Sequence, residues 1–263
     1  MFRRRVRSMV RVSVAVSAVS AVALALSVSA RADQALPTGR AIVDRFVEAI
    51  GGAAAFRAVE TMHATGTFAM PAQGIVGTIE VMSSRPANIR LRAEIDGVGQ
   101  IERGYDGKIG WSIDPMAGPA LITGRQLQEL IDDALFEGPL HPADKVSELT
   151  TVEQTTFDGQ AAHKVKVVFT SGTEQFEYFA VDSGLLIGSE GSREMPGGGL
   201  VPRVSILREY REFGALRQPT VLVQQTLGLE QVVTVKSYEY NTVTADAFTP
   251  PAAVLALIKK PTS

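Results

Sequence analysis

Apolar and polar residues alternate with a period of two along most of the chain beyond residue 61. In the clearest stretch, residues 88–95, Ile89 and Leu91 alternate with Arg90 and Arg92. Because successive strand residues point to opposite faces of a sheet, this pattern predicts a half-buried strand with the two arginines facing outward. Similar runs predict about eleven strands, at residues 62–68, 75–82, 88–95, 100–105, 108–114, 149–157, 160–170, 174–181, 204–213, 220–227 and 229–241.

Short turn signals separate most of these runs. Asp96-Gly97, Asp106-Gly107 and Asp158-Gly159 each lie between two alternating segments, and Asp-Gly is a strong hairpin signal because both residues tolerate a positive φ. Short hairpins join antiparallel neighbours, whereas parallel strands need long crossovers. We therefore predict a mainly β protein with a few helices (class α+β), whose long antiparallel meander curls on itself. We predict a flexible loop at residues 196–202, where three consecutive glycines occur.

The apolar spacing changes to a helical one in three places. Residues 42–50 predict an amphipathic helix that ends at Gly51-Gly52, and residues 53–59 predict a second short helical piece. A third helix is predicted after Thr123, with Gln126 completing a capping box and Gly138 ending the segment. Because this amphipathic helix interrupts the meander, we predict that it forms a lid over the sheet, with the lid residues Leu127, Leu130, Ile131 and Leu135.

Residues 1–32 are typical of an export signal. A positively charged start is followed by an apolar stretch and by a small-x-small site at Ala30-Arg31-Ala32. We predict cleavage there and a single domain at residues 33–263 in a bacterial periplasm. An uncleaved membrane anchor is the alternative.

Composition narrows the function. Residues 1–32 hold six arginines and no acidic residue, so the remainder has 20 basic and 28 acidic side chains, a formal net charge of −8. An acidic domain is unlike a nucleic-acid-binding one. Cysteine is absent, which excludes disulfides and thiol catalysis.

No catalytic or metal-binding motif stands out. The sequence has no nucleophile elbow, no His-Glu-x-x-His and no phosphate-binding loop, so we predict no enzyme activity, no cofactor and no metal site. We interpret the three histidines, at positions 63, 141 and 163, as ordinary solvated or hydrogen-bonded side chains. Glu174 and Glu177 lie on a strand with Gln175 and predict a solvent-facing surface.

Trp111 and Arg103 are less easily assigned. Trp111, the only tryptophan, lies in phase with Ile109 and Ile113 on a predicted inward face, where it packs in the core or lines a ligand cavity. Arg103 lies in phase with Ile101 and Tyr105, so its charge is expected on the concave side. A buried arginine must be paired. It either meets a carboxylate or serves as a polar contact in an apolar site.

Four segments together resemble the periplasmic lipoprotein-carrier superfamily of LolA and LolB, which includes outer-membrane lipoprotein-sorting proteins. They lie at residues 41–52, 104–115, 178–186 and 246–250. The resemblance implies a half-open antiparallel barrel covered by helices, with an apolar cavity for acyl chains. The chain departs from LolB-type acceptors in having no cysteine to acylate.

The resemblance further implies a non-enzymatic carrier that transfers a lipid or lipoprotein toward the outer membrane. A membrane-bound donor or acceptor protein is then a possible partner. We predict that the cavity is lined by Phe68, Ile79, Leu91, Arg103, Tyr105 and Trp111. Two alternatives stay open: an envelope-stress sensor that uses the same fold to bind a protein, and an enzyme built on clustered carboxylates.

Overall fold

The computed structural model describes residues 35–195 and 197–258. From Leu36 onward the described chain forms one compact unit. The predicted export signal at residues 1–32 and its cleavage site lie outside the described residues.

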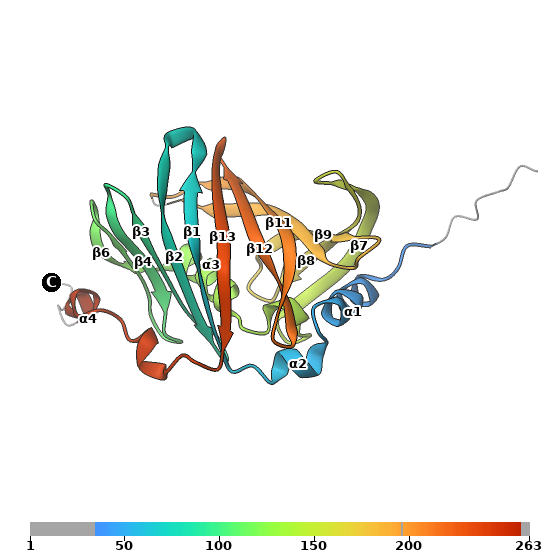
Figure 1. Cartoon of the computed structure of the whole chain (residues 1–263), viewed down its shortest axis with the longest axis horizontal. Helices are drawn as coiled ribbons and strands as arrows, with labels where there is room; N and C mark the ends of the chain where they lie inside the picture. The colour runs from blue at the N-terminus through green and yellow to red at the C-terminus, as the bar shows by residue number, and fades with distance from the viewer. Residues whose placement is uncertain (1–34, 196, 259–263) are drawn as a thin grey trace, which may run out of the picture. The chain divides into compact units, whose positions relative to one another are not determined.

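The described chain contains a single sheet of thirteen antiparallel strands in the order β6-β5-β4-β3-β2-β1-β13-β12-β11-β10-β9-β8-β7. Two hairpin meanders, β1–β6 and β7–β13, are joined where β1 pairs with β13. Strands β6 and β7 form the two edges, and the sheet curves around helix α3 (Figure 1). The strands are β1 Thr61–Met70, β2 Ile75–Ser84, β3 Asn88–Ile95, β4 Gly99–Tyr105, β5 Gly110–Asp114, β6 Gly118–Ile122, β7 Val146–Phe157, β8 Gln160–Phe169, β9 Glu174–Ala180, β10 Leu186–Glu194, β11 Leu200–Phe213, β12 Leu216–Thr226 and β13 Leu229–Tyr240.

The predicted number of about eleven strands is wrong because two strands carry weak signals. Strand β6 is only five residues long, too short to display alternation, and β10 contains two glycines and mostly polar residues. Strand β11 also begins at Leu200, inside the segment predicted as a flexible loop, and Pro202 faces Ser192 of β10. The antiparallel curled sheet itself is confirmed, whereas no pairing of the edge strands closes it into a barrel among the described residues.

Four α-helices and three short 3-10 helices accompany the sheet (Figure 1). Helix α1 begins after Thr38, whose hydroxyl accepts a hydrogen bond from the amide of Ala41. Its buried stripe, which includes Val43 and Phe46, packs in one core with residues of β8 and β9. The helices are α1 Gly39–Ala49, α2 Ala53–Arg57, α3 Gly124–Ala134 and α4 Ala252–Ile258, and the 3-10 helices are η1 Pro71–Gln73, η2 Gly138–Leu140 and η3 Ala245–Phe248.

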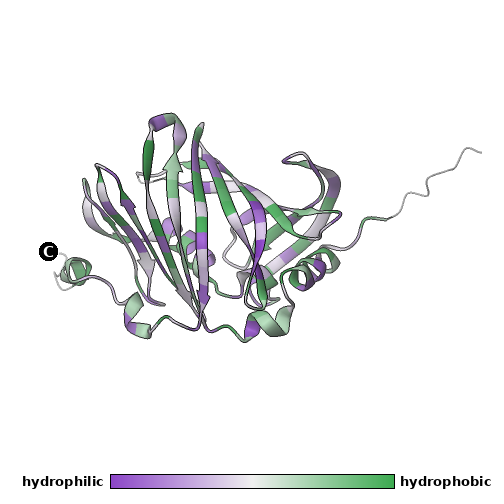
Figure 2. Cartoon of the chain, viewed as in Figure 1, coloured by the Kyte–Doolittle hydropathy of each residue, from purple (hydrophilic) through white to green (hydrophobic). Residues whose placement is uncertain are grey.

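The sheet has an inner face, toward α3, and an outer face. Figure 2 shows apolar and polar residues alternating along several strands. On the outer face Arg90 and Arg92 lie where the sequence predicts them, and η3 covers Arg90, which donates to the carbonyl of Ala247 at 2.8 Å. Arg90 also pairs with the buried carboxylate of Glu102 at 3.0 Å.

Trp111 lies on the outer face, so its predicted inward orientation is wrong. It pairs across the ladder with Gly104, while Arg103 pairs with Ser112, which places Trp111 and Arg103 on opposite faces. The indole is fully buried, donates to Glu102 at 3.1 Å and lies flat against Gly104. A Cβ added at Gly104 would lie only 2.2 Å from Trp111 Cζ2.

This contact gives a test of the fold. We expect Gly104→Ala to lower the free energy of unfolding by about 1–3 kcal/mol, because overpacking forces a well-packed neighbour to move. Urea unfolding followed by circular dichroism measures the change. Gly138→Ala is the matched control, since a Cβ there meets nothing within 4 Å, and equal midpoints for the two variants would contradict the described packing.

Candidate functional site

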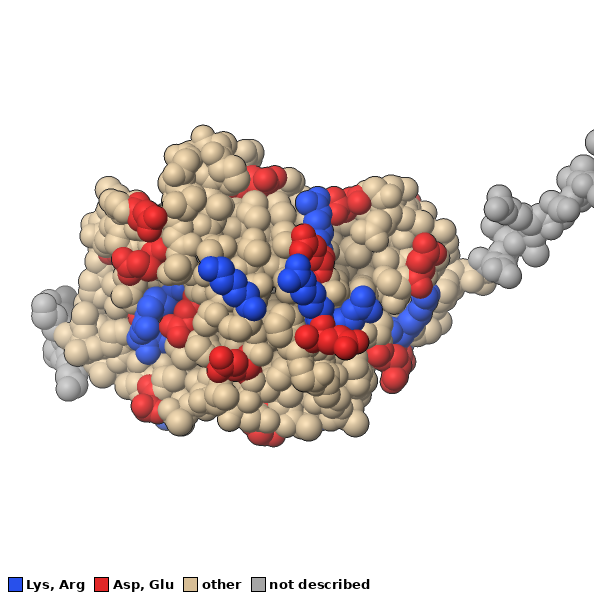
Figure 3. Space-filling model, viewed as in Figure 1, with Lys and Arg blue, Asp and Glu red and all other residues tan. Residues whose placement is uncertain are grey.

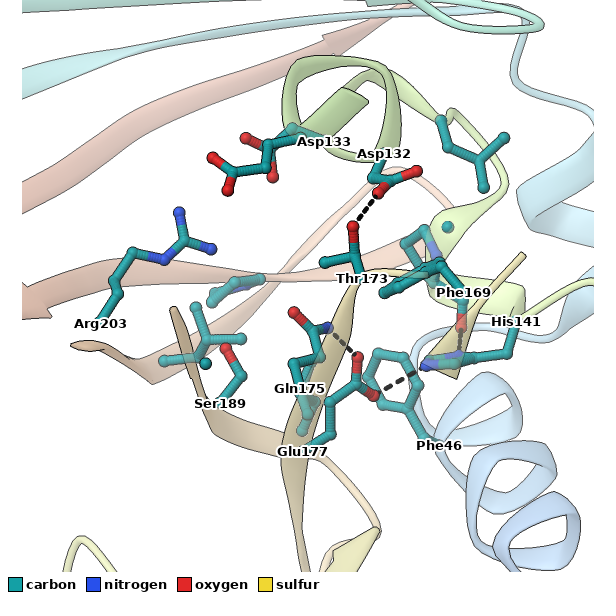
Figure 4. A pocket seen from close by; sticks show the side chains of 18 of the residues that line it. Phe46, Asp132, Asp133, His141, Phe169, Thr173, Gln175, Glu177, Ser189 and Arg203 are labelled. Atoms are coloured by element: carbon teal, nitrogen blue, oxygen red, sulfur yellow. Dashed lines mark hydrogen bonds and ion pairs between the residues drawn. The ribbon is translucent and has the colours of Figure 1, made fainter. Parts of the chain in front are cut away.

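A cavity of about 350 Å³ lies on the inner face, between α1, α3 and the strands β8–β12 (Figure 4). One end is apolar. Helix α1 and the segment after it contribute Phe46 and Ile50, α2 contributes Phe56, and the remaining apolar contacts come from the end of α3 and from the sheet. These are Leu135, Phe169, Leu186, Leu207 and Tyr210.

The other end of the cavity carries charges. Arg193 and Arg203 extend from β10 and β11, and α3 contributes Glu129, Asp132 and Asp133. In Figure 4 the guanidinium of Arg203 points into the cavity, on the side of Asp133. The cavity is therefore amphipathic. Arg203 was not predicted as a site residue, because it falls between the loop predicted at residues 196–202 and the strand predicted at residues 204–213. On β11 it lies in phase with Ser205 and Leu207.

Several contacts on the polar side hold α3 against the sheet. Asp133 pairs with Arg193 at 2.6 Å, and Asp132 accepts hydrogen bonds from Thr173 at 2.7 Å and Ser171 at 2.8 Å. The Gln126 side-chain amide donates to the carbonyl of Met195 at 2.9 Å. Thr123 is the N-cap residue, as predicted, but its side chain makes no capping hydrogen bond. The predicted capping box is thus replaced by a contact between helix and sheet.

The apolar side of α3 packs on the opposite half of the sheet. Leu130 and Ala134 form a core with Tyr105 and Ile122, and Leu127 and Ile131 pack against it. Side-chain carbons of Leu127 and Leu130 approach Gly110 so closely that a Cβ there would lie within 3.1 Å of both. Three of the four predicted lid residues, Leu127, Leu130 and Ile131, therefore face the sheet, while the fourth, Leu135, lines the cavity.

Leu135 also separates the cavity from a second one. This smaller cavity, of about 190 Å³, lies between α2, the end of α3 and the centre of the sheet. Leu135 lines both cavities, and so do Phe56, Asp133, Pro139 and Gln218. The segment that follows α3 thus acts as a partition inside the concave sheet.

A buried ion pair lies at the apolar end. His141 is 4% exposed and Glu177 is 5% exposed, so the prediction that Glu177 faces solvent is wrong. The two side chains meet at 2.8 Å between Nε2 and Oε2, and Gln175 donates to the other Glu177 oxygen at 2.7 Å. The His141 reading as a hydrogen-bonded histidine is confirmed. No local pattern reveals this pair, because its members are 36 residues apart.

The surroundings of His141 favour its charged form. Its Nδ1 lies 3.2 Å from the Pro139 carbonyl oxygen, so both ring nitrogens face acceptors and only the doubly protonated ring donates to both. Burial opposes ionisation, but the charge of Glu177 and the hydrogen bonds to Glu177 and Pro139 together raise the pKa of His141 above its usual 6.5.

The six residues predicted to line a ligand cavity are divided by the structure. Phe68, Ile79, Leu91, Arg103 and Tyr105 share the inner face of β1–β4, and Trp111 lies on the outer face. None of the six lines the 350 Å³ cavity, which is built on the other half of the sheet. Contact of these residues with a ligand stays a prediction.

Comparison with solved structures identifies the fold. A LolA superfamily protein from Nitrosomonas europaea matches with a TM-score of 0.54 and 13% identity, over 82% of this chain and 99% of that one. A DUF1329 family protein from Desulfovibrio piger matches with a TM-score of 0.53 and 12% identity, over 82% and 98%. The chain therefore has a LolA-like fold, as the sequence resemblance implied. No family model and no curated protein matches the sequence.

Within residues 35–195 and 197–258, no helix is both long and apolar enough to cross a membrane. No three histidine or acidic side chains among them gather in an arrangement that would hold a metal ion.

The His141–Glu177 pair predicts a pH dependence with a definite sign. A raised folded-state pKa means that the pair contributes stability below the unfolded value of about 6.5, and that this contribution is lost as pH rises through the folded pKa. Urea unfolding is measured for the wild-type protein and for His141→Gln between pH 5 and pH 9. We expect the difference in free energy of unfolding, in favour of the wild type, to decrease as pH rises.

His163→Gln is the control with the opposite sign. Burial and the charge of Arg45 lower the pKa of His163, so neutral His163 is favoured in the fold and the wild type loses stability relative to this variant as pH falls. A wild-type advantage over His141→Gln that grows from pH 5 to pH 9 contradicts the described pair.

Proposed function

We propose that the protein is a non-enzymatic carrier that binds the acyl chain of a lipid or lipoprotein in the amphipathic cavity and moves it through the periplasm toward the outer membrane. The observation that carries this proposal is the unfilled apolar end of the cavity between α1, α2 and the sheet. The LolA-like fold and the predicted export signal support the same function and location.

The cavity dimensions constrain how a chain is held. Its volume of about 350 Å³ lies at the low end of the range of roughly 300–1,000 Å³ typical of ligand sites. A displaced Leu135 would join it to the neighbouring 190 Å³ cavity. A long acyl chain is therefore accommodated by movement of the segment that follows α3.

Release needs a similar movement. Burying each methylene contributes about 0.8 kcal/mol, so a long acyl chain gains on the order of 12 kcal/mol before the costs of binding, which makes spontaneous release slow. The two sides of α3 differ in what opening costs. The apolar side buries Leu130 and Ala134, whereas the ion pair of Asp133 with Arg193 is partly exposed. We infer that opening begins at the polar side.

Figure 3 shows the charged side chains on the outer face. Basic and acidic side chains lie close to one another there, without a patch of one sign.

Leu135, which lines both cavities, provides the main test. We expect Leu135→Gln to weaken binding of a fluorescent monopalmitoyl glycerol roughly tenfold, because a buried amide meets the acyl chain without a hydrogen-bond partner. Fluorescence titration measures the Kd, and circular dichroism checks the fold. Val152→Gln, at a position 46% exposed on β7, is the control. Equal affinity of Leu135→Gln and the wild type excludes this cavity as the acyl-chain site.

The ion pair of Asp133 with Arg193, which we call the polar tether, predicts an effect on the rate of ligand release. Asp133→Asn removes the ion pair with Arg193, and partly exposed ion pairs contribute about 0.2–1 kcal/mol, so we expect release of the same uncharged probe to become about two- to fivefold faster. Stopped-flow transfer to excess vesicles measures the rate. Asp144→Asn loses an exposed ion pair with Lys145 outside the cavity and is the control. An unchanged release rate in Asp133→Asn means that the tether does not limit opening.

A further inference from the structure

Two arginines and three carboxylates line the polar end of the cavity. They are Arg193 and Arg203 of the sheet and Glu129, Asp132 and Asp133 of α3. Arg103 does not line the cavity, but it lies on the inner face of β4, and its Nη2 donates to the carbonyl of Gln126 on α3 at 3.5 Å. The six side chains together carry no net charge.

The three carboxylates already have partners. Asp133 pairs with Arg193 at 2.6 Å, and Asp132 accepts hydrogen bonds from Thr173 and Ser171. Glu129 accepts a hydrogen bond from the backbone amide of Glu194 at 3.0 Å and one from Arg125 at 3.4 Å. Among the described residues, none of the three acids forms an ion pair with Arg103 or Arg203.

The other two guanidinium groups lack such contacts. Within residues 35–195 and 197–258, Arg203 makes no hydrogen bond and no ion pair, and Figure 4 shows it directed into the cavity. Arg103 makes one long contact, from Nη2 to the Gln126 carbonyl at 3.5 Å, and its Nε is buried with no partner among these residues. Burial and the neighbouring charge of Arg193 lower the pKa of both Arg103 and Arg203.

Such an arrangement is costly unless something compensates it. Arg103 and Arg203 are half-buried, and a charge that loses part of its hydration without gaining a partner is destabilised. A guanidinium presents its donors in a fork that matches the oxygens of a phosphate, a sulfonate or a carboxylate. An anion at this end of the cavity would supply the missing acceptors for both arginines.

We infer that Arg103 and Arg203 bind the anionic head group of an amphiphile whose acyl chain occupies the apolar end of the same cavity. This inference rests on the proposed function and specifies its ligand class. The carrier then selects a singly charged lipid, such as a phosphodiester, over a neutral or zwitterionic lipid with the same chain. The interaction also fixes the orientation of the ligand, with its head group between β11 and α3.

Two lysolipids with the same palmitoyl chain test the selection. Lysophosphatidylglycerol carries a net charge of −1 and lysophosphatidylcholine carries none, and both are titrated calorimetrically below their micelle concentrations. We expect the wild-type protein to bind the anionic lysolipid at least about tenfold more tightly, as charge-assisted hydrogen bonds imply. Glycerol phosphate is the third probe, because it carries the head-group chemistry without a chain.

Variants assign the preference to the two arginines. Arg203→Gln and Arg103→Gln are each expected to reduce the preference several-fold and together to abolish it, with the larger loss of affinity for lysophosphatidylglycerol, because choline already offsets the phosphate charge of lysophosphatidylcholine. Arg203→Lys is expected to restore part of it, because the charge returns. Arg211→Gln, at an exposed position outside the cavity, is the control.

The outcomes separate this inference from the proposed function. Equal affinity of the wild type for the two lysolipids overturns the head-group site and leaves the carrier function standing. A preference that survives in a folded double variant overturns the assignment to these arginines. Glycerol phosphate that binds as tightly as the anionic lysolipid shows a site for free phosphate, which also overturns the inference. Failure of both lysolipids to bind overturns the carrier function as well.

Discussion

Helix α3 packs against two chemically different halves of one concave sheet, and the rest of the structure depends on that constraint. The sheet curls because thirteen antiparallel strands accumulate twist, and its inner face needs a cover. The half formed by β3–β6 presents apolar side chains, against which α3 buries Leu130 and Ala134. The half formed by β8–β11 presents polar groups, and α3 meets them with Asp132 and Asp133.

This division leaves the interior unfilled in a particular way. Apolar packing fixes one side of α3 tightly, while polar tethers hold the other side across a cavity. The end of the helix places Leu135 between two hollow regions. An interior of this kind has an apolar end for a hydrocarbon chain and a charged end for a head group, and the least costly movement joins the two hollow regions. The proposed carriage of an amphiphile rests on this division of the interior.

The sequence predicted the strands well wherever one face is buried and the other is exposed to solvent, because a period of two is then visible in each strand alone. It assigned faces wrongly where a turn resets the phase. Residue Tyr105 pairs with Gly110 across the four-residue turn between β4 and β5, which places Trp111 on the outer face although it lies in phase with Tyr105 along the chain.

The candidate site was harder to predict because its contacts are not local. Glu177 reads as a solvent-facing residue of β9 until His141 is brought to it from a loop 36 residues away. Arg203 becomes visible as an inward residue only once β11 is known to begin at Leu200. The predicted lid helix was located correctly, with Gly124–Ala134 as its bounds. The contacts that hold its polar side toward the cavity come from β8–β10 and their turns. The residue pattern of α3 alone does not reveal these contacts.

The most direct test of the central claim is to identify what the purified protein carries. The protein would be purified from the periplasm of an expressing bacterium without detergent, extracted with organic solvent and analysed by quantitative mass spectrometry. The account predicts an acyl-chain amphiphile in near-stoichiometric amount. Extracts with no more lipid than those of a similarly exported control protein would contradict it.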